Sequence, residues 1–243
     1  MSGEGWLDAN GLMQAFRRKA RAQGVTYQAA KATGLLRQGH HIDAVMLDDG
    51  TQLHCGTVIN AAGTGAAALA RSAGIDLPVQ SRKRCVFHFD TPEAAPGCPL
   101  VIDPSGVYFR PEGRGFLCGV ALPEDQDPEC FDFDVQHGLF DDLLWPTLAQ
   151  RVPGFEAVRV RNAWAGHYDV NLLDHNLILG AHPQVDNLLF ANGFSGHGLQ
   201  QSPAVGRALA ELVVAGRFET LDMAEFGWSR VLENRPLREI NVV

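Results

Sequence analysis

The strongest constraint on the fold is a strand, a glycine turn and a helix near the C-terminus. The apolar run Leu188–Ala191 leads into Gly193-Phe194-Ser195-Gly196-His197-Gly198, after which apolar residues recur at helical spacing from Val205 to Val213. Glycines let a backbone approach a ligand closely, and the free N–H groups of a helix's first turn favour an anionic or electron-rich group. A turn that only packs a strand on a helix needs fewer glycines, so the pattern favours a bound cofactor.

Composition excludes several classes of protein. With 243 residues, 46% of them hydrophobic and 20% charged, the chain can bury a large core as one domain or two interleaved domains. A net charge of −8 disfavours a nucleic-acid partner, and the basic clusters Arg17-Arg18-Lys19 and Arg82-Lys83-Arg84 are interpreted as solvated faces. The five cysteines form no Cys-x-x-Cys pair, which indicates neither a disulfide framework nor a zinc site and fits a reducing compartment. No apolar run approaches membrane-spanning length.

The first 80 residues alternate between helical and extended patterns. Asp8 and Asn10 can cap a helix that ends at Gly24, since small and apolar residues recur at every fourth place after them. The pair Asp49-Gly50 between apolar runs indicates a hairpin or a small meander. After that helix we predict a strand at Val25–Ala29, the meander at Leu35–Leu53, a buried strand at Thr57–Ala62 and a helix at Ala66–Ser72.

The pattern changes between Lys83 and Leu122, where short β-rich runs alternate with Pro and Gly turns, and this predicts an antiparallel sheet. A helix over Asp132–Gln150 and a long strand over Val158–Tyr168 are predicted next, before alternating α and β patterns return after Asp174. The β-rich runs are Cys85–Phe89, Leu100–Ile102, Val107–Arg110 and Phe116–Ala121, and the inward positions of the helix are Leu139, Leu143, Leu144 and Leu148.

The glycine turn resembles the C-terminal signature of the D-amino acid oxidase and sarcosine oxidase superfamily of FAD-dependent oxidoreductases. That signature consists of a strand, the sequence GFSGHG and a helix that starts with an SPAVG-like sequence. Within it, the chain looks most similar to the FAD-dependent oxidoreductase domain-containing protein 1 group, which shares Arg82-Lys83-Arg84, Arg151-Val152-Pro153 and Gly193–Gln201. Other stretches that match in family order are Gly5-Trp6-Leu7-Asp8, Val58–Gly63, Tyr108-Phe109-Arg110-Pro111 and Trp164–Asp169.

This resemblance implies an α/β fold with an α+β substrate part. A glutathione-reductase-type FAD domain would be interrupted by a mixed or antiparallel sheet that forms the substrate domain. The chain would comprise one part of the FAD domain at residues 1–80, the substrate domain at 81–165 and the C-terminal part of the FAD domain at 166–243. Non-covalent FAD is expected, because His167 stands where monomeric sarcosine oxidases carry the cysteine that attaches their flavin.

A second glycine motif, Gly63-Thr64-Gly65-Ala66-Ala67-Ala68, matches the dinucleotide fingerprint GxGxxA. The strand before it follows a meander, and the acidic residue expected about twenty positions later is absent. We interpret it as the turn after the family's second FAD-domain strand, close to the cofactor's diphosphate and ribose. The family's GxGxxG would then lie upstream of Met1, and we expect the chain to be a fragment that lacks the first βαβ unit.

The resemblance also implies candidate site residues, several with a structural alternative. His197 would border the flavin or bond the backbone at a helix N-terminus. Arg110 would bind a carboxylate or form a surface salt bridge, and Tyr168 would contact substrate or pack in the core. The candidate catalytic residues are His167, Tyr168, His197 and Arg110. The candidate cofactor contacts are Ala32, Ala62, Gly63, Gly65, Gly193, Phe194, Ser195, Gly196, His197, Gly198, Leu199 and Gln200.

The expected activity is oxidation of a small amine or amino acid by hydride transfer to FAD. Gln200 and Leu117 stand where sarcosine oxidases carry lysines that bind the substrate carboxylate and activate oxygen, which favours a dehydrogenase with another electron acceptor. One alternative is a flavoprotein scaffold, because the most similar group is associated with assembly of respiratory complex I. The expected location is cytoplasmic, or the mitochondrial matrix in a eukaryote.

A metal oxygenase is a further alternative. His167, Asp169 and either His175 or His182 could form a facial triad, since residues two apart on a strand share a face. Against this, Asp174 and His175 lie in a turn-like stretch typical of a surface loop in the resembled family. We therefore expect FAD and no metal.

Overall fold

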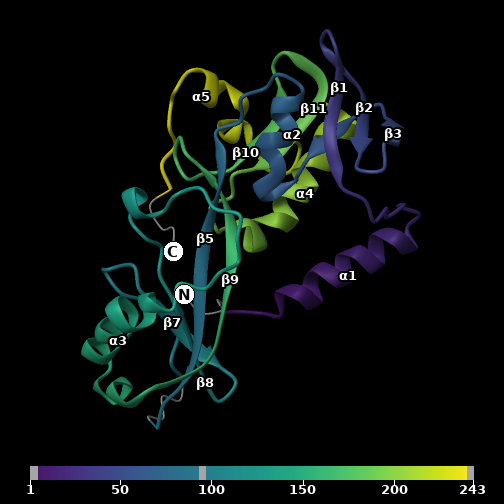
Figure 1. Cartoon of the computed structure of the whole chain (residues 1–243). Helices are drawn as coiled ribbons and strands as arrows, with labels where there is room; N and C mark the ends of the chain where they lie inside the picture. The colour runs from purple at the N-terminus through teal and green to yellow at the C-terminus, as the bar shows by residue number, and fades with distance from the viewer. Residues whose placement is uncertain (1–4, 93–96, 240–243) are drawn as a thin grey trace.

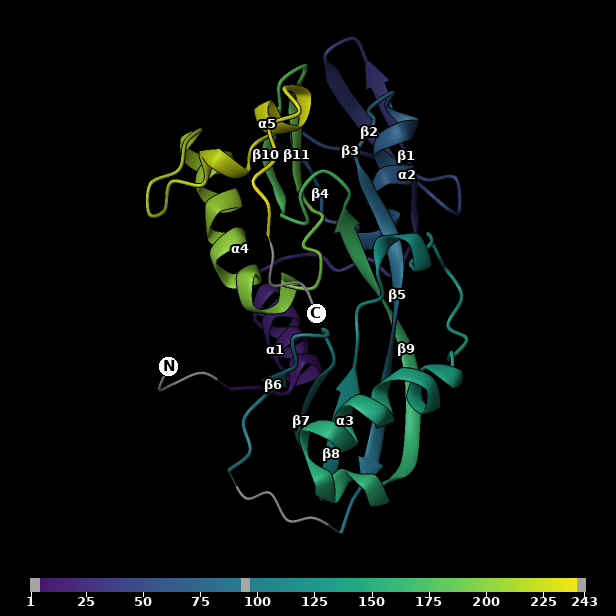
Figure 2. The same ribbon diagram turned by 90° about the vertical axis from the view of Figure 1, so that its left-hand side faces the viewer.

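Two long strands organise the fold of this computed structural model, which describes residues 5–92 and 97–239 (Figure 1). The strands β5 (Val79–Asp90) and β9 (Arg159–Asn171) pair antiparallel from Val79 opposite Asn171 to Asp90 opposite Arg159. They run side by side through the middle of the molecule and connect its two ends (Figures 1 and 2). The described residues form three sheets, one of which contains both strands.

The N-terminal part contains the predicted capped helix and meander. Asp8 Oδ1 accepts from Gly11 N at 2.9 Å and so caps α1 (Ala9–Ala22), which extends away from the rest of the chain in Figure 1. The antiparallel meander consists of β1 (Ala32–Gln38), β2 (His41–Leu47) and β3 (Gln52–His54). The strand predicted at Val25–Ala29 is wrong. This segment is exposed and joins no sheet in the described chain, and Tyr27 instead lies under the Arg17 guanidinium, 3.8 Å from the ring centroid.

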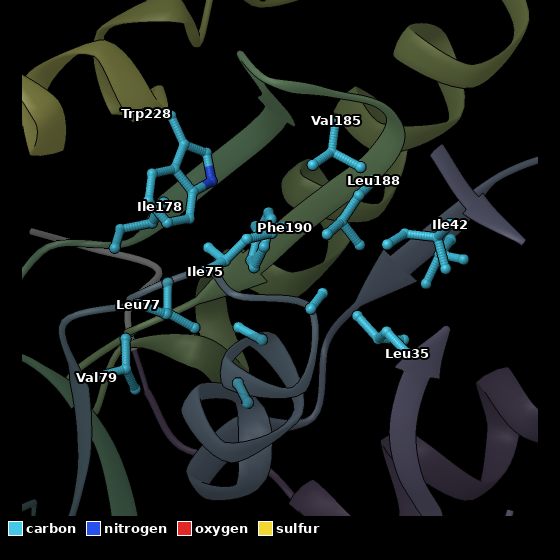
Figure 3. Packing of buried hydrophobic residues seen from close by; sticks show 14 residues of the cluster. Leu35, Ile42, Ile75, Leu77, Val79, Ile178, Val185, Leu188, Phe190 and Trp228 are labelled. Atoms are coloured by element: carbon cyan, nitrogen blue, oxygen red, sulfur yellow. The ribbon is translucent and has the colours of Figure 1, made fainter. Parts of the chain in front are cut away.

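The second sheet leads to the glycine turn and has the order β10-β11-β4. Its central strand β11 (Val185–Asn192) pairs parallel with β4 (Val58–Asn60) and antiparallel with β10 (Ile178–His182). Alternate side chains of β11 enter two cores, one shared with α2 (Ala66–Ser72) and α5 (Trp228–Leu232), the other with α4 (Gly198–Ala215). In Figure 3, Leu188 and Phe190 lie in the first of these cores, together with Trp228.

The third sheet has the order β6-β7-β8-β5-β9 and confirms the predicted antiparallel sheet. It includes β6 (Val101–Ile102), β7 (Tyr108–Glu112) and β8 (Gly115–Gly119). One face packs on α3 (Trp145–Arg151), as Figure 2 shows, and on η4 (Pro153–Ala157). Phe155 of η4 is fully buried, and its ring contacts the rings of Phe89, Phe109 and Phe116. We call the opposite face the open face. It carries the alternate side chains Arg82, Arg84, Tyr108, Arg110, Leu117, Trp164 and Tyr168.

The helix predicted over Asp132–Gln150 is wrong in its first third. Asp132 Oδ1 accepts from Lys83 Nζ at 2.7 Å and from Asp134 N at 2.9 Å, and these bonds hold the segment in an irregular conformation. Helical structure begins at Gly138, includes the π-helical turn η3 (Phe140–Leu144) and continues as α3. Of the four leucines predicted to face inward, Leu144 and Leu148 are buried, while Leu139 and Leu143 pack on the edge of the core.

The mixture of helices and sheets confirms the predicted α/β class with an α+β part. The remaining short elements are η1 (Gly63–Gly65), η2 (Glu124–Gln126) and η5 (Ala224–Phe226). The predicted domain boundaries fall near the start of β5 and in the middle of β9, and the division into domains stays a prediction. Within the described ranges, no helix is both long enough and apolar enough to cross a membrane.

Candidate active site

Two residues of the glycine turn must be glycine because side chains of β9 lie against them. Gly193 has a φ of +72°, and a Cβ there would stand 2.8 Å from Asn171 Cβ. Gly196 has a φ of +100°, and a Cβ there would stand 2.6 Å from Cε2 of the Tyr168 ring. The turn therefore combines left-handed backbone with close packing on β9.

Ser195 holds the middle of the turn although its φ is +50°, which is uncommon for a residue other than glycine. Its side chain is fully buried, and its Oγ accepts from Asn171 N at 3.1 Å and donates to Gly193 O at 3.2 Å. Its N–H donates to Asp169 O at 3.1 Å. These bonds compensate for the strained backbone and attach the turn to β9.

Asp169 supplies the second attachment of the turn. Its Oδ2 accepts from Gly193 N at 2.8 Å, and Val170 and Phe194 form a bridge next to this bond. Burial raises the pKa of the Asp169 carboxyl, and the N–H groups of Gly193 and Phe194 lower it. Asp169 thus positions the turn through one oxygen while its carboxylate is partly withdrawn from water.

The helix that follows the turn begins without a side-chain cap. His197 occupies the N-cap position, and no side chain in residues 5–92 and 97–239 caps the first N–H groups of α4, at Gly198, Leu199 and Gln200. The Leu199 and Gln200 side chains are exposed. Pro203 has no N–H and so cannot donate to the carbonyl of Leu199 one turn earlier. Ser202 Oγ donates to this carbonyl instead, at 2.9 Å. The helix start can therefore offer three N–H groups to a ligand.

An open hollow of about 540 Å³ lies beside this turn. One side consists of the turn after β4, from Ala61 to Thr64, and the other side of Phe133, His167 and Asp169. His167 Nε2 is buried without a hydrogen-bond partner in the described chain, and the ring of Phe133 lies 4.5 Å from the His167 ring, edge to face. Asp169 therefore connects the hollow to the glycine turn.

The structure brings some of the predicted cofactor contacts together. Ala62 and Gly63 line the hollow, and Gly65 follows them in η1. The residues from Gly193 to Gln200 form the neighbouring turn and helix start. Ala32 is the first residue of β1, is exposed, and is not among the residues that line the hollow.

The four candidate catalytic residues do not share one site. His167 and Tyr168 are adjacent on β9, so His167 lines the hollow while Tyr168 lies on the open face against Gly196. Arg110 forms a salt bridge with Glu112, donates to Pro111 O at 2.9 Å and lies 5.3 Å from the Trp6 ring centroid. His197 stays at the N-cap of α4.

The metal alternative has no geometric basis in the described residues. No group of three or more His, Cys, Asp or Glu side chains in residues 5–92 and 97–239 is arranged to hold a metal ion. His182 packs its ring on Trp228, 4.7 Å between centroids, and His175 stands in the turn after β9 with a φ of +59°. Neither histidine lines the hollow that contains His167 and Asp169.

Sequence reasoning missed two residues of the open face. The cluster Arg82-Lys83-Arg84 was expected to be solvated, but the structure leaves Arg82 and Arg84 each only 9% exposed. They belong to β5, where i and i+2 share a face, so both point to the same side and Lys83 points to the other. A cationic run inside a β-rich segment was the available signal, since charged residues at alternate positions of a central strand are not ordinary surface residues.

Solved structures with the same fold define the class of protein. L-proline dehydrogenase from P. horikoshii superposes with a TM-score of 0.82 at 22% identity, covering 93% of this chain and 60% of that one. Glycine oxidase from Geobacillus kaustophilus gives a TM-score of 0.71 at 25% identity, covering 89% and 56%. The fold is thus that of flavin-dependent oxidoreductases.

Sequence comparison gives the family. Residues 1–212 match the family model DAO, FAD dependent oxidoreductase, so the chain belongs to this family, as the glycine turn predicted. It is 41% identical over 276 residues to FAD-dependent oxidoreductase domain-containing protein 1 of Xenopus laevis, an alignment that covers 100% of this chain and 55% of the relative. The chain therefore spans about half the length of the curated relatives it matches.

FAD is the cofactor of the family, and the observed site fits such a group. The turn after β4 lines the hollow with Ala61, Ala62 and Gly63, which carry no bulky side chains, and the start of α4 has N–H groups that no side chain of the described residues caps. His167 adds a buried ring nitrogen without a partner. All three features are those of a site that a polar, planar ligand would complete.

Proposed function

We propose that the protein represented by this chain oxidises a small amine or amino acid by hydride transfer to non-covalently bound FAD. The observation that carries the proposal is the connection of the glycine turn to the hollow through Asp169. The names of two proteins with the same fold, L-proline dehydrogenase and glycine oxidase, support an amine or amino-acid substrate.

The residues of the site would have distinct roles. Bound FAD would supply the electron acceptor for a C–H bond next to nitrogen. Gly193, Phe194 and Ser195 use their N–H groups to fix the turn, so the N–H groups at the start of α4 remain to hold an electron-rich ring edge. His167 would contact the cofactor from the lining of the hollow, and its buried Nε2 has no hydrogen-bond partner in the described residues.

Dehydrogenase chemistry is favoured over oxidase chemistry within the proposal. Leu117 is buried and apolar at the position where the resembled oxidases carry an oxygen-activating lysine. Lys83, on the same side of the sheet as His167, is paired with Asp132 at 2.7 Å. A cation that is already neutralised is a weak stabiliser of superoxide, so another electron acceptor is expected.

The proposal is tested by flavin binding and flavin reduction. The purified chain is mixed with FAD and scanned from about 350 to 500 nm, and a form extended toward the length of the relatives is scanned in parallel. Proline, glycine and N-methylglycine are then added without oxygen, and the loss of flavin absorbance is followed. Rapid reoxidation of the reduced flavin by an artificial electron acceptor, together with slow reoxidation by oxygen, supports a dehydrogenase. Bound flavin that no amine reduces would favour the scaffold alternative.

A matched pair of variants tests the site itself. Ala62 lines the hollow and is exposed, so Ala62→Glu introduces bulk and negative charge without disturbing the core, and FAD affinity should fall about tenfold or more, which is roughly 1.4 kcal/mol. Ala68→Glu makes the same change on the exposed side of α2 and should leave FAD affinity unchanged. Equal affinities for the two variants would place the cofactor elsewhere.

A further inference from the structure

Two arginines on the open face are buried with too few negative charges around them. Arg82 and Arg84 are each 9% exposed. Arg84 pairs with Asp127, Nη1 to Oδ2 at 2.9 Å, whereas Arg82 takes part in no ion pair of the described chain and donates from Nη2 to the Gln80 side-chain oxygen at 2.7 Å. Asp127 is therefore the one carboxylate of the described residues within ion-pair distance of either guanidinium group. A buried charge without a counter-charge is costly, so the pair calls for a further anion.

The Arg84 guanidinium also has an unused edge. Its bonds to Lys83 O, at 2.8 Å, and to both oxygens of Asp127 all start from Nη1. Nε is buried and has no partner in the described residues. The Nε and Nη2 groups form the edge with which arginine binds a carboxylate through two parallel hydrogen bonds. No hydrogen bond of the described residues uses that edge.

The surroundings of the two arginines suit a small polar ligand next to the glycine turn. The Arg84 guanidinium lies 5.3 Å from the Tyr168 ring centroid, and Tyr168 stands opposite Arg82 on the neighbouring strand. The Tyr168 ring in turn lies against Gly196. Burial raises the pKa of the Tyr108 and Tyr168 phenols above the usual value, and the positive charge of Arg84 offsets only part of this rise. Both phenols therefore stay protonated and can donate hydrogen bonds near this cation.

We propose that Arg82 and Arg84 bind the carboxylate of the substrate on the open face of the sheet. This inference rests on the proposed function and narrows its substrate class from amines to amino acids. It also excludes Arg110 from substrate binding, because Glu112 already neutralises the charge of Arg110. The carboxylate would take the unused edge of Arg84 and balance the charge of Arg82, and Tyr168 would lie between this anion and the glycine turn.

Binding of acetate and of its neutral isostere acetamide tests the inference without any turnover. The chain is titrated with each probe at constant ionic strength, with and without added FAD, and the tryptophan fluorescence is followed, since Trp164 lies on the open face and is 41% exposed. Saturable binding of acetate but not of acetamide is expected. Acetate that fails to bind in either state, or acetamide that binds equally well, overturns the inference.

Variants assign the binding to these two side chains. Arg82→Gln and Arg84→Gln should each weaken acetate binding about tenfold or more, and Arg84→Lys, which keeps the charge but loses the fork, should weaken it less. Arg161→Gln removes an exposed arginine that pairs with Asp90 and should bind acetate as the wild type does. Circular dichroism shows whether each variant is folded, and the lysine variant provides the test if a glutamine variant is not. Equal acetate affinity in all folded variants refutes the assignment.

Failure of this inference and failure of the proposed function give different results. If FAD binds and acetate affinity does not depend on Arg82 or Arg84, the substrate carboxylate is bound elsewhere while the flavin proposal stands. If acetate binding depends on both arginines but no flavin binds to the chain or to its extended form, the anion site stands and the oxidoreductase proposal fails.

Discussion

At the scale of single residues, the glycine turn depends on partners that lie 24 positions earlier in the chain. Gly193 N bonds to Asp169, and the Ser195 hydroxyl accepts from Asn171 N. The glycines themselves predicted a turn and a ligand, because their conformational freedom can be inferred from sequence. Asp169 could not be assigned as the residue that positions the turn, because sequence alone does not show which strand edge lies beside it.

Gly196→Ala should destabilise the protein. The new methyl group would meet the Tyr168 ring, and alanine is strained at a φ of +100°, so a loss of about 1–3 kcal/mol in the free energy of unfolding is expected from urea denaturation. Gly206→Ala is the control, because Gly206 lies within α4 with open space around its Cα and should gain up to about 1 kcal/mol. Similar effects of the two substitutions would mean that the turn does not pack on Tyr168.

Asp169→Asn should change how stability depends on pH. Burial raises the pKa of Asp169 in the folded protein, so the native state keeps this proton to a higher pH than the unfolded chain does. The associated stability is complete below the unfolded pKa of about 3.9 and is lost as the pH rises through the folded pKa. Asparagine avoids this loss and can still accept from Gly193 N. Urea midpoints should therefore shift in favour of the variant as the pH rises from about 4 to 7, and a constant difference would contradict the expectation.

At the scale of elements, sequence predicted those that local signals define. The cap at Asp8, the Asp49-Gly50 turn and the Pro and Gly breaks of the third sheet all act within a few residues. The strand predicted at residues 25–29 does not form, because a strand needs a neighbouring strand to pair with, and no strand of the described chain pairs with this segment. The helix predicted at residues 132–137 is absent because Lys83, a distant partner, binds Asp132. The buried arginines were missed because the side to which each strand residue points depends on the register of β5 with β9.

Phe155→Ala should show how far η4 supports the third sheet. The Phe155 ring is fully buried, with centroids 5.3 Å from Phe89, 5.4 Å from Phe109 and 4.9 Å from Phe116. Its removal leaves a cavity and should cost about 3–5 kcal/mol in thermal or urea unfolding. Phe131→Ala, at a side chain that is 63% exposed, should cost less than about 0.5 kcal/mol. A small effect at Phe155 would mean that the core refills the space.

At the scale of the whole molecule, a buried ion pair joins α5 to the turn after β9. Arg230 Nε lies 3.1 Å from Asp174 Oδ2, and both side chains are almost completely buried. The same Asp174 oxygen accepts from Leu237 N at 2.9 Å, so one carboxylate orders both the turn and the C-terminal segment. Sequence could not pair these residues, because they are 56 positions apart and belong to different elements.

Asp174→Asn should be strongly destabilising. It leaves the Arg230 charge buried without a counter-charge, and about 3–5 kcal/mol of unfolding free energy should be lost. The double variant Asp174→Asn with Arg230→Met removes that unpaired charge and should recover part of the loss. Glu219→Gln breaks the exposed pair with Arg217 and should cost less than about 1 kcal/mol. If the double variant is less stable than Asp174→Asn, the arginine contributes mainly through its bonds to backbone carbonyls.

The parallel pairing of β4 with β11 has a kinetic consequence. Leu188 pairs with Val58, and the whole third sheet lies between them in the sequence, so this contact closes a very long loop. Pairings of this kind form slowly and late in folding. We therefore expect the glycine turn, which follows β11, to acquire its conformation after the third sheet has formed. A ligand of that turn would then bind only the completed fold, slowing unfolding while leaving the folding rate unchanged.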